Sequence, residues 1–239
     1  RLDVRVRLLG ELETYRRLEV QHRLPFINEV KRIANLSLAM SGVPQDSSIH
    51  FESWRLKLRV SLLPSQYGEK IVFRLLDLSK KFDLGAQGFA PCEQQALEFA
   101  LQYENGLILI SGPTGSGKTT TLYSLLCAID RARKNVMTLE DPVEYEIAGL
   151  TQTQVSESLS FSQALRSTLR QDPDVILVGE IRDEETARLC IAAASTGHLV
   201  LSTLHANSAG EACARLRTLG IEEAQLSSLL RISAAQRLV

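Results

Sequence analysis

The sequence predicts an α/β protein in which a doubly wound parallel sheet follows a smaller α+β domain. Three observations carry this prediction. Short apolar runs recur along residues 93–205, separated by helical stretches or polar loops, as parallel strands covered on both faces do. Residues 1–83 instead alternate apolar and polar side chains in the period of half-buried strands. Residues 84–92 hold two glycines and a proline and are the best candidate linker between the two.

The first predicted domain opens with a strand and continues with a helix and two more strands. Apolar and polar residues alternate over residues 2–8, the period of a strand with one buried face. Apolar residues then recur every three or four positions over residues 26–34, directly after Pro25, which suits the first turn of a helix. Alternation returns over residues 54–62, and an apolar run at residues 71–76 follows a turn. We therefore expect a small strand-helix-strand-strand unit.

The second predicted domain begins at residue 93 and carries the parallel sheet. Its strands are short, almost wholly apolar runs, at residues 107–110, 136–139, 175–178 and 199–202. Such runs are typical of strands with helices on both faces of the sheet. Over residues 206–239, apolar residues recur at helical spacing, so we expect a helical C-terminal part. Because this part ends without a cap or a stop signal, we expect it to be truncated.

Composition and charge narrow the classes of function. The chain has 239 residues, 44% of them hydrophobic, and a mean hydropathy of -0.02, which is typical of a folded globular protein. Lysine and arginine number 27 against 28 acidic residues, so no global positive field favours nucleic acid as a partner. No apolar run approaches the roughly 20 residues of a membrane span, and no signal peptide opens the chain, so we expect a cytoplasmic protein. The four cysteines form no C-x-x-C pair, and we interpret them as packing thiols.

The strongest functional signal is a glycine-rich loop that fits the pattern G-x-x-x-x-G-K-[ST]. It follows a predicted strand and precedes a predicted helix. In such a loop, backbone N–H groups turn inward around phosphates, and the helix N-terminus adds to their attraction. Lys118 would contact the β- and γ-phosphates, and the Thr119 hydroxyl would contact Mg²⁺. The predicted nucleotide-binding residues are Gly112, Pro113, Thr114, Gly115, Ser116, Gly117, Lys118, Thr119 and Thr120.

Carboxylates follow two of the predicted strands, at the edge where open α/β sheets bind their ligands. Glu180 comes after the run 175–178 and is placed like a Walker B acid. Gly179 stands where the usual aspartate would be, so we expect any contact between Glu180 and Mg²⁺ to run through water. The preceding strand closes with further carboxylates, at Glu140, Asp141 and Glu144.

One histidine and one arginine complete the candidates from the residues alone. His205 follows the strand near residues 199–203, whereas His198 precedes it, so His205 is the better sensor of a γ-phosphate. Arg74 interrupts the apolar run 71–76. A guanidinium there needs a carboxylate or phosphate partner, and the small domain could supply it to a neighbouring nucleotide as an arginine finger does.

Four motifs in series resemble the secretion ATPases of type II secretion and type IV pilus assembly, the GspE/PilB type. They are GPTGSGKTT, TLEDPVEY (the Asp box), LRQDPDVILVGEIRD and TGHLVLSTLHAN (the His box), in that family's order and at similar spacing. The resemblance extends to VSLLPSQYGEKIVFRLLD in the first domain and to AGLTQTQV after the Asp box, so it covers nearly the whole chain. It implies a RecA-like P-loop NTPase core preceded by a PAS-like domain.

The resemblance also implies a role for each site residue, with ATP and Mg²⁺ as the bound groups. Lys118 and Thr119 bind the nucleotide and the metal, and Glu180 is the Walker B glutamate beside that metal. Glu144, with Glu140, serves the attacking water. The spacing of the motif does not decide which of these two glutamates is the base, and we favour Glu144.

The remaining matches are two histidines and several arginines. His198 and His205 match the His box. Arg59 and Arg74 match arginines that the smaller domain offers to nucleotide, within one subunit or across a subunit boundary. Further family arginines are matched more weakly by Arg166, Arg170, Arg182 and Arg215.

The function that the resemblance implies is Mg²⁺-dependent ATP hydrolysis by a ring, a hexamer, that powers type II secretion or type IV pilus assembly. Inner-membrane platform proteins would be its partners and would hold it at that membrane. We expect an N-terminal docking region and a C-terminal tetracysteine zinc module to lie outside this chain. Two alternatives stay open: a retraction-type pilus ATPase, and a docking module that binds ATP but hydrolyses little. A nucleic-acid motor is disfavoured by the balanced charge and the lack of a basic, aromatic-rich segment.

Overall fold

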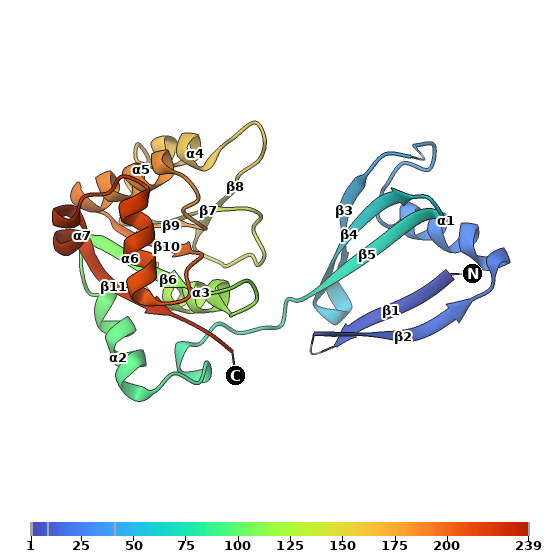
Figure 1. Ribbon diagram of the computed structural model, residues 1–239, viewed down its shortest axis with the longest axis horizontal. Coiled ribbons are helices and arrows are strands. Elements are labelled where there is room, and N and C mark those ends of the chain that lie inside the picture. Colours follow the sequence, from blue (N-terminus) through green and yellow to red (C-terminus); the bar gives the residue numbers. More distant parts are fainter. Residues whose placement is uncertain (1, 9, 41, 239) are drawn as a thin grey trace. The chain divides into compact units, whose positions relative to one another are not determined.

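The computed structural model describes residues 2–8, 10–40 and 42–238. The chain divides into two compact units, Arg1–Lys80 and Lys81–Val239 (Figure 1). No helix among the described residues is long and apolar enough to cross a membrane.

The first unit combines a hairpin, one helix and a separate antiparallel sheet. Its elements are β1 (Leu2–Leu8), β2 (Glu11–Leu18), α1 (Arg23–Ile33), β3 (Gln45–Phe51), β4 (Leu56–Ser65) and β5 (Gly68–Asp77). Strands β1 and β2 form the hairpin, and the sheet has the order β3-β4-β5. Val30 of α1 and Ala34, which follows its last residue, pack with Val60 of β4, so the helix covers one face of that sheet. The buried Lys31 of α1 donates to Glu69 Oε1 of β5 at 2.7 Å, which ties the same two layers together.

Two strands of this unit were not predicted, and both lack the signal of apolar alternation. Strand β2 has the sequence ELETYRRL. Seven of its eight residues are exposed, so buried and exposed side chains do not alternate along it. Strand β3 reads QDSSIHF and alternates in burial while being polar for most of its length. Backbone pairing with a neighbouring strand, rather than side-chain burial, accounts for both.

The second unit is built on a six-stranded parallel sheet with the order β11-β6-β10-β9-β7-β8. Its strands are β6 (Gly106–Ser111), β7 (Val136–Glu140), β8 (Thr151–Gln154), β9 (Val175–Val178), β10 (Leu199–Leu204) and β11 (Leu230–Ala235). Four of them, β6, β7, β9 and β10, are the predicted apolar runs. Strand β8 was not predicted, since TQTQ is a polar strand at the sheet edge.

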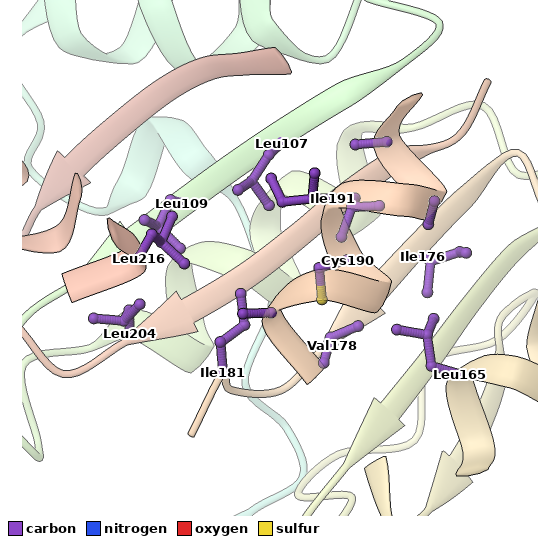
Figure 2. Packing of buried hydrophobic residues seen from close by; sticks show 14 of the residues in the cluster. Leu107, Leu109, Leu165, Ile176, Val178, Ile181, Cys190, Ile191, Leu204 and Leu216 are labelled. Atoms are coloured by element: carbon purple, nitrogen blue, oxygen red, sulfur yellow. The ribbon is translucent and has the colours of Figure 1, made fainter. Parts of the chain in front are cut away.

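Helices cover both faces of this sheet, which confirms the doubly wound prediction. They are α2 (Pro91–Ala100), α3 (Lys118–Ala128), α4 (Phe161–Thr168), α5 (Glu184–Ser195), α6 (Ala209–Thr218) and α7 (Glu223–Leu229). Leu107 and Leu109 of β6 pack into the cluster with α4, α5, α6 and α7, part of which Figure 2 shows. Ile108 and Ile110 point to the opposite face and pack with α2 and α3. The alternation along one wholly buried strand therefore builds two cores.

The expectation of a helical tail over residues 206–239 is wrong at its end. Helices α6 and α7 are present, but residues 230–235 form β11, which pairs in parallel with β6. Leu226, Leu229 and Leu230 continue the helical spacing up to the strand, which is why the pattern misled. The backbone groups at the edge of β6 offer a full ladder of hydrogen bonds, and that tertiary pairing overrides the local spacing.

The segment over residues 84–92, predicted as a linker, packs on the second unit. Leu84 lies in a short 3-10 helix, is only 5% exposed and joins the cluster with α2 and α3. The Asp83 side chain accepts from the backbone N–H of Gly85 at 3.0 Å and caps this turn. The second unit correspondingly starts at Lys81.

Candidate nucleotide-binding site

The glycine-rich loop lies between the end of β6 and the start of α3, at the carboxyl edge of the parallel sheet. Gly112 and Gly117 adopt φ angles of 147° and 89°, a region that favours glycine. A Cβ on Gly112 would lie 2.4 Å from the carbonyl oxygen of Gln236 and 2.6 Å from Ser116 Oγ. The loop therefore closes tightly because no side chain occupies that position.

Lys118 is the first residue of α3, and its side chain folds back into this loop. Its ammonium donates to the carbonyl oxygens of Gly112 at 2.8 Å and Pro113 at 2.9 Å. Burial lowers the pKa of Lys118 from its ordinary value, and the nearby Glu180 carboxylate opposes that shift. A cation held by neutral carbonyls inside a glycine loop is well suited to receive an anionic phosphate.

Two observations test whether the loop fits a triphosphate. Ser116 Oγ is buried and has no hydrogen-bond partner among the described residues, and a buried hydroxyl without a partner is costly unless a ligand completes it. A Cβ on Gly115 would meet open space, so the outer side of the loop leaves room for a ligand. The residues present therefore fit the phosphates of a nucleotide.

The described residues contain no group of three or more His, Cys, Asp or Glu side chains that could hold a metal ion by themselves. Mg²⁺ in nucleotide sites is commonly held by one or two protein oxygens together with phosphate oxygens and water. The exposed Thr119 and the partly buried Glu180 could supply such oxygens. The donor set suits a magnesium ion that arrives with its nucleotide.

A cluster of charged side chains forms around Glu180, just after β9. Arg182 Nη2 lies 2.5 Å from Glu180 Oε1, and Arg182 Nη1 lies 3.6 Å from Asp141 Oδ2. His205 Nε2 lies 3.8 Å from Glu180 Oε2. The hydrogen bond to Glu180 raises the pKa of the Arg182 guanidinium further, so that arginine stays charged. The ends of β7, β9 and β10 thus bring Asp141, Glu180 and His205 together, as their positions at strand ends predicted.

The two Asp-box glutamates have different surroundings. Glu140 is 4% exposed and accepts hydrogen bonds from Tyr123, from Thr138 at 2.5 Å and from Gln152 at 3.1 Å. Glu144 is half-buried, and no hydrogen bond or ion pair holds its carboxylate among the described residues. A carboxylate enclosed by three donors is poorly placed to take a proton from water. Of the pair implied by the family resemblance, Glu144 is therefore the one whose carboxylate is free.

Arg59 and Arg74 of the first unit lie directly opposite each other in the register of β4 and β5. Directly opposed like charges destabilise a sheet, and neither guanidinium has an acidic partner among the described residues. Both arginines were candidates from the sequence, but only the strand register shows that they face the same side as a pair. Together they form a site of positive charge on that face of the sheet, suited to an anion.

The other predicted polar residues make local contacts. His198 Nδ1 lies 2.9 Å from the carbonyl oxygen of Ala193, at the start of β10. Arg166 pairs with Glu185 at 2.9 Å, and Arg170 donates to the carbonyl oxygen of Arg166 at 2.8 Å. These contacts hold helix ends and turns, and they support no role at the loop.

Sequence reasoning missed two glutamines beside the loop. Thr121 Oγ1, one turn into α3, lies 2.8 Å from Gln87 Oε1 and 2.8 Å from Gln236 Oε1. One hydroxyl proton can serve only one acceptor, so one of the amides presents its NH₂ group to Thr121. Gln236 follows β11, and only the pairing of β11 with β6 brings it to the loop. No sequence motif could have signalled it.

The parallel sheet with its order, and the loop between β6 and α3, define a P-loop protein of RecA-like fold. The whole chain, residues 1–239, matches the model of the family described as "Type II/IV secretion system protein", and the chain belongs to that family. It is 47% identical over 243 residues to the type II secretion system protein E of Dickeya dadantii (strain 3937), a match that covers 100% of this chain and 49% of that protein.

Two further similarities point to the same family and fold. The chain is 44% identical over 246 residues to the type IV pilus assembly ATPase PilB of Thermus thermophilus, which covers 100% of this chain and 27% of that protein. Among solved structures, the pilus retraction motor PilT with bound ADP superposes with a TM-score of 0.75 at 30% identity, covering 95% of this chain and 68% of that one. The chain thus spans about half the length, or less, of these curated relatives. The resemblance to secretion and pilus ATPases, and the RecA-like core, are confirmed.

Proposed function

We propose that the chain is the catalytic part of a motor ATPase that hydrolyses ATP with Mg²⁺ and powers type II secretion or type IV pilus assembly. The observation that carries this proposal is the arrangement at one sheet edge of a buried loop lysine, Lys118, with Glu180 and the Asp-box loop. Phosphoryl transfer to water depends chiefly on positioning and on stabilisation of phosphate charge, and this edge offers groups for both.

Each side chain has a task in this proposal. Lys118 and the loop N–H groups bind the phosphates, and Thr119 with Glu180 would hold Mg²⁺, which when bound neutralises charge on phosphate oxygens. Glu144 accepts the proton of the attacking water, since its carboxylate is free. His205, beside Glu180, responds to the γ-phosphate.

The arginine pair of the first unit supports an oligomeric ATPase. Arg59 and Arg74 would supply positive charge to the transferred phosphoryl group, because an anion relieves the repulsion between two opposed guanidiniums. We propose a ring, a hexamer, in which such arginines complete each site. Its partners would be inner-membrane platform proteins of a secretion or pilus system, which would hold a cytoplasmic motor at that membrane. Nucleic acid is no part of the proposal.

Sequence identity favours secretion or pilus assembly over pilus retraction. The relatives named for type II secretion and pilus assembly are 47% and 44% identical, whereas the retraction motor is 30% identical. The other candidate, a docking module with little turnover, has no observation that favours it, because no predicted catalytic position is missing.

The test replaces the carboxylates without changing their shape. In the full chain, Glu144→Gln and Glu180→Gln should lower kcat by about a hundredfold or more while the ATP dissociation constant changes by less than about threefold. Glu146→Gln, an exposed glutamate in the same loop, is the matched control and should behave as the wild type. Undiminished ATP hydrolysis in both variants would contradict the catalytic roles proposed for Glu144 and Glu180. Tight binding with near-zero turnover in the wild type would instead favour the docking module.

A further inference from the structure

We propose that Glu140 is a positioning residue that, through Tyr123, ties the helix of the phosphate loop to the segment carrying Glu144. This inference rests on the proposed function and adds to it a link between nucleotide binding and the catalytic base. It also gives the first glutamate of the Asp box a task other than contact with water.

The carboxylate of Glu140 lies at the meeting point of three elements. It accepts from the Tyr123 hydroxyl of α3, from Thr138 of β7 at 2.5 Å and from Gln152 of β8 at 3.1 Å. Tyr123 is fully buried. All three groups that face the carboxylate donate to it, so an ionised glutamate satisfies this position and an amide does not.

Tyr123 links Glu140 to α3 and packs against the Asp-box loop. Burial and the Glu140 carboxylate raise the pKa of the Tyr123 hydroxyl, so it keeps its proton and donates a hydrogen bond to Glu140. The backbone groups of Tyr145 and Glu144 oppose this shift of the pKa. The Tyr123 ring also lies edge-on to the Tyr145 ring, with centroids 6.1 Å apart. One side chain of α3 therefore contacts both the buried carboxylate and the residue next to the proposed base.

Gln152 makes a second connection to the same loop. Its amide nitrogen donates to Glu140 and, at 3.0 Å, to the carbonyl oxygen of Tyr145. Its amide oxygen accepts from the backbone N–H of Ile147 at 2.7 Å. The rings of Tyr123 and Tyr145 both pack edge-on against Phe82, with centroids 5.1 and 5.0 Å away. The loop after Asp141 is thus held to α3 by one hydrogen-bonded route, through Glu140 and Gln152, and by one aromatic cluster.

The consequence follows from where α3 begins. Lys118 is its first residue and Tyr123 lies on the second turn, so a shift of α3 when phosphate enters the loop displaces the Tyr123 hydroxyl as well. That hydroxyl donates to Glu140, which Gln152 joins to the backbone next to Glu144. Glu140 keeps the hydroxyl oriented, so the base is set in place by the same helix that binds the phosphates.

A double-mutant cycle in the full chain tests the link. Tyr123→Phe removes one donor and keeps the ring, and Glu140→Gln sets an amide NH₂ against donors. Each substitution should lower kcat for ATP hydrolysis by about tenfold and leave the ATP dissociation constant unchanged. The kcat of the double variant should be no lower than that of the less active single variant. Tyr103→Phe is the matched control, because its ring contacts Phe99 and Arg231 and lies outside the network.

Amide hydrogen exchange over residues 144–150 provides a readout that needs no turnover. Exchange there should be about five- to tenfold faster in Tyr123→Phe and in Glu140→Gln than in the wild type and Tyr103→Phe. If the wild type proves inactive, the proposed function fails while this measurement still tests the network. The proposal is overturned if Glu140→Gln abolishes turnover while Tyr123→Phe leaves both turnover and exchange unchanged, since Glu140 would then act on water itself. Unchanged exchange in both variants overturns it as well.

Discussion

A single missing side chain sets the shape of the phosphate loop at Gly112. Its φ of 147° is strained for any other residue, and a Cβ there would meet the Gln236 carbonyl oxygen and Ser116 Oγ. The carbonyl oxygen of the same residue accepts from the Lys118 ammonium at 2.8 Å. Conformation, packing and the position of the cation therefore depend on one residue.

Gly112→Ala should destabilise the second unit by about 3 kcal/mol and weaken ATP binding, because backbone strain and overpacking add. Gly197→Ala is the control: its φ of 105° is strained too, but a Cβ there meets nothing within 4 Å. It should cost about 1 kcal/mol and leave ATP binding unchanged. Urea unfolding followed by far-UV circular dichroism, with nucleotide titration, distinguishes the two. Equal losses of stability would show that the contacts at Gly112 are unimportant.

At the scale of elements, β11 decides how the second unit is completed. It fills the free edge of β6 and carries Gln236 to the loop. Its register is held by Arg231, which donates to the Asn105 carbonyl oxygen at 2.9 Å and to Asn105 Oδ1 at 3.1 Å. The Arg231 guanidinium also lies 4.7 Å from the centre of the Tyr103 ring. One side chain thus connects the starts of the two strands.

Arg231→Ala should lower the unfolding free energy of the second unit by about 1 kcal/mol, since it removes three charge-assisted hydrogen bonds and one cation-π contact at a half-buried site. Arg237→Ala, at an exposed arginine just beyond β11, should change it by less than about 0.5 kcal/mol. Chemical denaturation followed by circular dichroism is suitable, because the one tryptophan, Trp54, lies in the first unit. If the two variants lose the same stability, Arg231 does not hold the strand.

At the scale of the whole molecule, the two units carry different parts of the proposed chemistry. The second holds the phosphate loop, Glu144, Glu180 and His205, and the first holds the opposed arginines. Neither arginine has an acidic partner among the described residues of its own unit. The proposed site is therefore incomplete within the second unit, and a first unit, from the same chain or from a neighbour in the proposed ring, would complete it.

ATP turnover per chain should rise with protein concentration before reaching a plateau, because a neighbour completes each site in the proposed ring. Steady-state hydrolysis over a wide range of protein concentrations, with Lys118→Ala as the blank, measures this dependence. Arg74→Ala should lower the plateau by about a hundredfold, because arginines that stabilise a transferred phosphoryl group have effects of that order or larger. A specific activity independent of concentration, with Arg74→Ala fully active, would contradict the ring.

Elements marked by a pattern of burial or by a sequence motif were predictable from the sequence. The four apolar runs appeared as β6, β7, β9 and β10, and the run 112–119 appeared as a loop between strand and helix. Strands β2, β3 and β8 were not predictable, because backbone pairing with a neighbour sustains them where side-chain alternation is weak or absent. The site residues at strand ends met as expected, since parallel strands end at one edge.

The sequence by itself determined the class of fold, the family and the loop that would bind phosphate, because periodicity and motif spacing are local properties of the chain. Only the tertiary structure decided which residues lie next to one another in the folded protein. It enclosed Glu140 among three donors, gave the carboxylate of Glu144 no partner among the described residues and set Arg59 opposite Arg74. It also turned the end of an expected helix into β11. These outcomes depend on strand order and register, which join residues far apart in the chain and leave no local pattern.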